Sequence, residues 1–116
     1  MSERIIKQWH IYTVNLEPNL GTKPGKQRPC LAIQPTLFTE KGIQSVVILP
    51  LTSQIKDAFP IRVRIKKGEC SLSTDSDIMV DQITSWDISL FKQDLGEIPT
   101  ALQNQVKDAV RLFLAL

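Results

Sequence analysis

Residues 45–51 have the sequence Ser45-Val46-Val47-Ile48-Leu49-Pro50-Leu51, the most strand-like run in the chain. β-Branched and aliphatic residues favour extended backbone, and a short apolar run bounded by turn residues is typical of a buried strand. A turn region around residues 39–42 precedes this run, and before that turn residues 29–34 also favour a strand. We expect these two strands to pair as a hairpin.

Three more segments have the pattern of strands. Residues 10–16 alternate apolar and polar side chains, and residues 76–86 form an apolar run interrupted by polar residues, which we interpret as one strand. In residues 59–65 the alternation is strict, so one face is apolar and the other is basic through Arg62 and Arg64. We therefore predict a half-buried strand with a basic outer face.

The end of the chain changes to a helical period. Thr100 is the expected N-cap, with Gln103 three residues later. About five short strands followed by one helix predict a small, strongly curved barrel with the helix packed outside, a β-dominated α+β fold. One helical face collects Leu102, Val106, Ala109, Val110 and Phe113.

The composition is that of one globular domain covering residues 1–116. Hydrophobic residues make up 42% and charged residues 22% of the chain, which excludes a disordered composition. No apolar run reaches the roughly 18 residues of a membrane helix, and residues 1–10 lack the apolar core of a secretory signal. We expect a cytoplasmic protein with no membrane contact.

Charge is unevenly distributed along the chain. Residues 1–68 contain eleven Lys/Arg and four Asp/Glu, a net charge of +7, whereas residues 69–116 contain three and eight, a net charge of −5. If the basic residues converge on one face, they can neutralise the phosphates of a nucleic acid. The alternative is an ordinary charged surface.

Metal-binding residues are scarce. Cys30 and Cys70 do not have the spacing of metal ligands, and His10 is the single histidine. A disulfide between the two cysteines is geometrically possible, although reduced thiols are the usual state in small intracellular domains. We expect chemistry without a metal or another cofactor.

Four motifs in this order resemble the MazF/PemK family of toxins over nearly the whole chain. They are Ile11-Tyr12-Thr13-Val14-Asn15-Leu16-Glu17-Pro18, Arg28-Pro29-Cys30-Leu31-Ala32-Ile33-Gln34, Leu49-Pro50-Leu51-Thr52-Ser53 and Ser76-Asp77-Ile78-Met79-Val80-Asp81-Gln82-Ile83-Thr84-Ser85-Trp86-Asp87. The resemblance implies an SH3-like barrel, a homodimer and metal-independent cleavage of single-stranded RNA, messenger RNA foremost, at short sequences. It also implies a cognate antitoxin whose disordered tail blocks the RNA groove.

By position in these motifs, Arg28 matches the family's essential arginine and Thr52 its essential threonine, with Ser53 adjacent. In such cleavage the RNA's own 2′-hydroxyl attacks phosphorus and leaves a 2′,3′-cyclic phosphate and a 5′-hydroxyl. A guanidinium suits the task of clamping the phosphate as its charge grows, and two hydroxyls can donate hydrogen bonds to the same oxygens. For Thr52 and Ser53 the competing interpretation is a plain strand-end cap.

Further candidates carry competing structural interpretations. Asp81 is a base, a group that orients Arg28, or a surface carboxylate. The departures from the family's pattern at Thr22 and Met79 weaken a proton-transfer role for Asp81, and His10 is a substitute proton carrier or a structural histidine. The expected RNA-binding residues, each of which can instead be a loop, surface or core residue, are Lys23, Lys26, Gln27, Gln54, Gln82 and Trp86.

Two other classes of function remain open. A toxin of the same fold can poison DNA gyrase, as CcdB-like relatives do, and a family member can bind RNA without cutting it. A gyrase poison is expected to concentrate its determinants in the C-terminal helix, whose last residues, 112–116, have the apolar pattern of packing. A bare structural SH3-like module would leave Arg28 unexplained.

Overall fold

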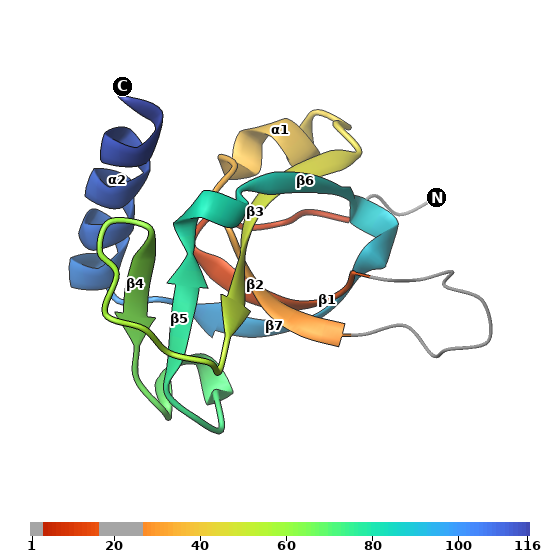
Figure 1. Ribbon diagram of the computed structural model, residues 1–116. Helices are drawn as coiled ribbons and strands as arrows, with labels where there is room; N and C mark the ends of the chain where they lie inside the picture. Colours follow the sequence, from red (N-terminus) through yellow and green to blue (C-terminus); the bar gives the residue numbers. More distant parts are fainter. Residues whose placement is uncertain (1–3, 17–26) are drawn as a thin grey trace, which may run out of the picture.

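The computed structural model describes residues 4–16 and 27–116, which form a curved antiparallel sheet with a helix against one side (Figure 1). This arrangement confirms the predicted β-dominated α+β fold. The strands are β1 (His10–Asn15), β2 (Gln27–Ala32), β3 (Ser45–Thr52), β4 (Arg62–Ile65), β5 (Ser76–Met79), β6 (Thr84–Asp87) and β7 (Phe91–Glu97). The helices are α1 (Thr36–Glu40) and α2 (Thr100–Leu114), with 3-10 turns η1 (Glu69–Ser71), η2 (Val80–Gln82) and η3 (Ile88–Leu90).

Strand β3 lies at the centre of the sheet, whose order is β4-β5-β3-β2-β1-β7. One edge of β3 pairs with β2, as expected, in a register that sets Cys30 opposite Pro50. The other edge is divided, since its first four residues pair with β6 and its last two pair with β5. Pro50 lies where β3 passes from one partner to the other, a place that suits a residue with no backbone N–H to donate.

Two hydrophobic clusters fill the molecule on opposite faces of β1, β2 and β3. On β3, Leu49 and Leu51 belong to the cluster beneath α2, while Val46 and Ile48 belong to the cluster enclosed by β1, β2, β6 and β7. Because both faces of the strand are buried, its sequence is continuously apolar and not alternating. The strand that leads to the candidate site is thereby anchored from two sides.

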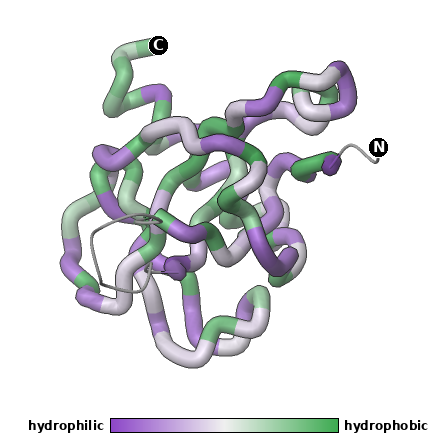
Figure 2. The backbone as a smooth tube through the Cα atoms, turned by 90° about the vertical axis from the view of Figure 1, so that its right-hand side faces the viewer, coloured by the Kyte–Doolittle hydropathy of each residue, from purple (hydrophilic) through white to green (hydrophobic). Residues whose placement is uncertain are grey.

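Helix α2 confirms the predicted amphipathic helix and packs against β4 and η2 (Figure 1). Val106 and Ala109 are fully buried on its inner face. Two details of the prediction were wrong. Pro99 is the N-cap and Thr100 is already helical, and Phe113 is 41% exposed because the helix extends beyond the sheet that it covers. The hydrophobic C-terminal end is thus left at the surface (Figure 2), with Leu112, Leu114 and Leu116 also exposed.

Other elements differ from the sequence-based expectations. Residues 76–86 are not one strand, because the η2 turn redirects the chain and sends β5 and β6 to different parts of β3. The strand expected at 59–65 begins only at Arg62, since residues 59–61 form a turn. Helix α1 and strand β7 were not predicted.

The basic outer face expected for residues 59–65 was also wrong. Arg62 and Arg64 do share one side of β4, but both are partly buried and form ion pairs with the buried Asp77. Part of the positive charge of residues 1–68 is therefore offset by a carboxylate from residues 69–116. No helix in the described part of the chain is both long and apolar enough to span a membrane.

Candidate active site

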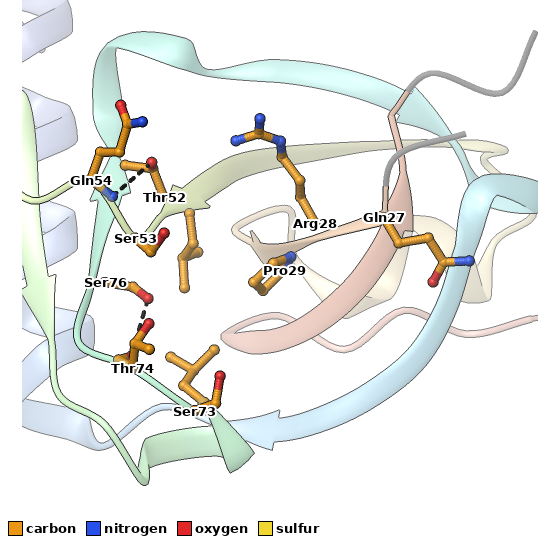
Figure 3. Close-up of a pocket in the computed structure, with 11 residues that line it drawn as sticks. Gln27, Arg28, Pro29, Thr52, Ser53, Gln54, Ser73, Thr74 and Ser76 are labelled. Carbon is orange, nitrogen blue, oxygen red and sulfur yellow. Dashed lines mark hydrogen bonds between the residues drawn. The ribbon is translucent and has the colours of Figure 1, made fainter. Parts of the chain in front are cut away.

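A cavity of about 680 Å³ lies between the start of β2, the end of β3 and the connection from β4 to β5 (Figure 3). This volume is within the range of ligand-binding clefts in proteins. We call it the groove. It is lined by Gln27, Arg28, Pro29, Leu51, Thr52, Ser53, Gln54, Leu72, Ser73, Thr74 and Ser76.

Arg28 supplies the positive charge of the groove. Its backbone is held opposite the fully buried Val14 of β1, and its half-buried side chain extends into the space that faces Thr52 and Gln54 (Figure 3). Among residues 4–16 and 27–116, no carboxylate forms an ion pair with Arg28. The guanidinium is therefore poised to bind an anionic group of a ligand.

Thr52 and Ser53 form the opposite side of the groove, at the end of β3. The Thr52 Oγ1 atom accepts a hydrogen bond of 3.2 Å from the backbone N–H of Gln54, which fixes the turn that follows the strand. A hydroxyl that accepts in this way still has its own hydrogen to donate. Two hydroxyl donors and one guanidinium thus face a shared space, the donor set that suits a phosphate.

A third wall of the groove was missed by the sequence analysis. It comes from Ser73, Thr74 and Ser76, and the Ser76 hydroxyl donates to the Thr74 carbonyl at 3.3 Å. The signal in the sequence was the density of hydroxyl residues from 71 to 76. These side chains add neutral hydrogen-bonding groups beside the single described cation of the groove.

The structure brings five of the predicted site residues together and places three elsewhere. Arg28, Thr52, Ser53, Gln27 and Gln54 all line the groove. Asp81 and Gln82 are exposed in η2, outside the groove lining, and Trp86 of β6 packs partly buried against the cluster around Phe91. Lys23 and Lys26 lie outside the described residues.

His10 is engaged away from the groove. Its Nδ1 atom lies 3.0 Å from Asp94 Oδ1, in a pair that links β1 to β7. His10 is four positions along β1 from Val14, the residue opposite Arg28, which corresponds to about 13 Å of strand. This geometry favours the structural interpretation of the histidine. The thiols of Cys30 and Cys70 are both free.

A second cavity, of about 590 Å³, lies behind the segment that follows Thr52 and contains the buried carboxyl of Asp77. Burial by itself would raise the pKa of Asp77, but hydrogen bonds from Arg64, from the Lys56 amide and from Arg62 hold the pKa below its usual value. The carboxylate is therefore charged at neutral pH. It is the only fully buried ionisable carboxyl among the described residues.

We expect this carboxyl to make the fold sensitive to acid. A group whose pKa is lower in the folded chain contributes stability above its unfolded pKa of about 3.9 and loses that stability as pH falls through the folded value. Thermal melts from about pH 7 down to about pH 2.5 should show Tm falling at the acid end. The fall should be smaller in Asp77→Asn, which has no such proton to take up. An equal fall in both proteins would assign acid sensitivity to other carboxyls.

Comparison with known proteins defines the class. Residues 7–114 match the family model described as PemK-like, MazF-like toxin of type II toxin-antitoxin system. The chain belongs to this family.

Curated relatives agree along nearly the whole chain. Endoribonuclease MazF2 of Mycobacterium bovis is 28% identical over 113 residues, which cover 97% of this chain and 99% of the relative. Endoribonuclease EndoA of Bacillus subtilis is 26% identical, with 97% of each chain covered. The predicted class, a toxin endoribonuclease, is thereby confirmed.

Solved structures share the fold. A MazE-MazF structure from Deinococcus radiodurans superposes with a TM-score of 0.80 at 21% identity, covering 97% of this chain and 98% of that one. A mycobacterial endoribonuclease in complex with its cognate antitoxin superposes with a TM-score of 0.74 at 20% identity, with 96% of each chain covered. The predicted MazF-type barrel is confirmed.

Proposed function

We propose that this toxin cuts single-stranded RNA, messenger RNA foremost, in the groove, without a metal or another cofactor. The observation that carries the proposal is the position of Arg28 across one cavity from Thr52 and Ser53. Arg28 and Thr52 come from two strands that are anchored in the core, so their relative positions are set by the barrel, and Ser53 directly follows Thr52. Such preorganised donors are the main requirement for stabilising a developing charge.

The chemistry proposed uses the substrate's own nucleophile. The 2′-oxygen attacks phosphorus, the bond from phosphorus to the 5′-oxygen breaks, and the proton lost by the 2′-hydroxyl is balanced by one gained at the 5′-oxygen. Arg28 binds the non-bridging oxygens, whose negative charge grows in the transition state, and Thr52 and Ser53 hold the phosphate in line for attack. The products are a 2′,3′-cyclic phosphate and a 5′-hydroxyl.

The donor chemistry of the chain supports this route. In the described ranges, no three side chains of His, Cys, Asp or Glu gather in a way that could hold a metal ion. The groove instead offers one described cation together with hydroxyl and amide groups. These groups suit a phosphate and the edges of unpaired bases.

The remaining predicted residues receive roles around this centre. Gln27 and Gln54, which line the groove, are proposed to bind base edges. Asp81 and Gln82, exposed in η2, are proposed to act where RNA enters or leaves, with Asp81 as the candidate for proton transfer or for orienting the arginine. Flanking phosphates are assigned to Lys23 and Lys26, and a supporting role beside RNA to Trp86.

The partners proposed are a cognate antitoxin that occupies the RNA groove and a second copy of the chain, both acting in the cytoplasm. The solved structures of the same fold include an endoribonuclease in complex with its cognate antitoxin. Exposed Leu112, Phe113 and Leu114 at the end of α2 provide apolar surface that a homodimer can bury. Sedimentation velocity of the purified chain distinguishes monomer from dimer.

The decisive experiment incubates the purified protein with long single-stranded RNAs in EDTA, maps cuts by primer extension and tests the new ends for 5′-hydroxyls. Discrete cuts that persist in EDTA support the proposal. Absence of cuts across varied RNAs, together with inhibition of DNA supercoiling by gyrase, would assign the fold to a gyrase poison. Binding without cuts or gyrase inhibition would assign it to a non-cleaving RNA binder.

Loss of either hydroxyl should slow cleavage. Each donates one hydrogen bond to a charged group, so Thr52→Val and Ser53→Ala should each lower kcat by about 10–100-fold. Single-turnover cleavage of a short RNA measures the effect. Thr100→Val, at the start of α2, is the matched control and should cut at the wild-type rate. A wild-type rate in Thr52→Val would leave that threonine as a strand-end cap.

A further inference from the structure

Asp77 lies one strand away from the wall of the groove that carries Thr52. In the sheet, Asp77 of β5 is directly opposite Thr52 of β3 on one side and Arg64 of β4 on the other. Directly opposed residues of antiparallel strands project from the same face of the sheet. Arg64, Asp77 and Thr52 therefore form a row across three strands, with the carboxylate in the middle.

The Asp77 carboxylate is fully buried and accepts three hydrogen bonds. Its Oδ1 atom accepts from Arg64 Nε at 2.6 Å, and its Oδ2 atom accepts from the Lys56 amide at 2.7 Å and from Arg62 Nη1 at 3.3 Å. These contacts come from β4 and from the segment after β3. One buried charge thus joins three parts of the chain.

Both arginines continue from Asp77 to the backbone of the segment after β3. Arg62 Nη1 also donates to the Gln54 carbonyl at 3.0 Å, and Arg64 Nη2 also donates to the Lys56 carbonyl at 3.4 Å. Residues 53–57 are exposed and have no strand neighbour. Their backbone polar groups at Gln54 and Lys56 are therefore tied, directly or through an arginine, to one carboxylate.

The tied segment is also a wall of the groove. It begins at Thr52 and Ser53 and includes Gln54, whose backbone N–H donates a hydrogen bond to the Thr52 hydroxyl oxygen. We propose that Asp77 is a positioning residue for RNA cleavage, which holds residues 53–57 through Arg62 and Arg64 so that the hydroxyls of Thr52 and Ser53 face Arg28. The inference rests on the proposed function of the groove.

A role in stability alone is a weaker explanation of the same contacts. The cost of desolvating a buried ion pair often offsets its attraction, so a cluster of apolar side chains could serve the fold equally well. Apolar side chains could not tie the Gln54 carbonyl and the Lys56 amide and carbonyl in place. Positioning predicts a loss in the chemical step, because a small misplacement of reacting groups costs rate more than affinity.

The test compares Asp77→Asn with wild type and with Asp94→Asn, at a temperature where circular dichroism shows all three folded. Asp94 is a matched control, because its carboxylate also contacts a nitrogen-bearing side chain, that of His10, and accepts from a backbone amide, but it lies on β7, at the far end of the sheet order. Asp77→Asn should lower kcat by at least about 10-fold. Its affinity for an RNA with a 2′-deoxy nucleotide at the cut site should stay within about 3-fold of wild type, since uniform binding is unchanged.

A second variant keeps the test decisive if Asp77→Asn does not fold. Arg62→Gln removes the bridge from Asp77 to the Gln54 carbonyl while Arg64 and the Lys56 amide remain bound to the carboxylate. It should also lower kcat with little change in affinity. Wild-type kcat in every folded variant would overturn the inference, and so would a loss of affinity that matches the loss of rate. If wild type and Asp94→Asn fail to cut RNA, the proposed function itself is wrong.

Discussion

Replacing Arg28 with alanine should lower kcat for RNA cleavage by about 10²–10³-fold, the usual effect of removing one preorganised donor from a transition state with developing negative charge. Arg28 is the single cation among the described residues that line the groove, so no described neighbour can take over its charge. Because its side chain is half-buried in a cleft and not in a core cluster, the barrel should remain folded. Single-turnover cleavage of a short RNA measures the rate.

Two further arginine variants serve as controls for Arg28→Ala. Arg28→Lys keeps the charge but loses the planar fork of donors, so it should recover part of the lost rate. Arg111→Ala removes an exposed charge from the last turn of α2 and should cut at the wild-type rate. If Arg28→Ala cuts within about 3-fold of wild type, electrostatic stabilisation by this arginine is not part of the mechanism.

Phe91→Ala should reduce the free energy of unfolding by about 3–5 kcal/mol, the range for removing a buried aromatic ring. Phe91 is 1% exposed, at the start of β7, and its ring packs edge-on against Tyr12 with centroids 5.7 Å apart. Loss of the ring leaves a cavity in the hydrophobic cluster that is enclosed by β1, β2, β6 and β7. Urea unfolding followed by circular dichroism measures the change in free energy.

The matched control is Phe38→Ala. Phe38 of α1 is 45% exposed, so the same truncation should cost less than about 1 kcal/mol. Equal losses from both variants would contradict the packing of β7 against β1 described above. Activity of Phe91→Ala at low temperature should match wild type, because the ring lies outside the groove lining.

Local sequence pattern was sufficient where burial is regular. Strand β3 could be predicted because both of its faces are buried, which produces an uninterrupted apolar run. Helix α2 could be predicted from the spacing of Val106 and Ala109 on one face. The exposed end of the same helix could not, because the length of the surface that it covers is set by distant strands.

Irregular elements were missed for physical reasons. Strand β7 has one fully buried residue, Phe91, followed by exposed residues 92–94, and its register with β1 shifts twice. That pattern lacks the alternation of a strand. The sequence of residues 76–86 resembles one continuous strand because Ile78 and Val80 are both buried. In the structure the chain turns at Val80, whose backbone N–H donates a hydrogen bond to the Ile61 carbonyl.

The candidate site was partly accessible from sequence. The motifs that carry the family resemblance identified Arg28, Thr52 and Ser53, and the structure brings all three to one groove. Asp77 was overlooked as a site residue, because its importance depends on which strands lie beside β5. An aspartate within an apolar strand and two arginines at alternate positions of another strand were the signals present. Only the pairing of β4 with β5 connects them.

The wall of the groove formed by Ser73 and Thr74 differs in kind from the other two walls. Arg28 and Thr52 belong to strands whose neighbouring residues fill the core, whereas Ser73 and Thr74 are exposed in a connection anchored by the buried Leu72. Substitutions in this connection are therefore expected to leave the barrel folded, whereas substitutions at the strand ends disturb the core beside them. Under the proposed function, variation confined to this wall would change which RNA is preferred while the groups proposed to cut it stay the same.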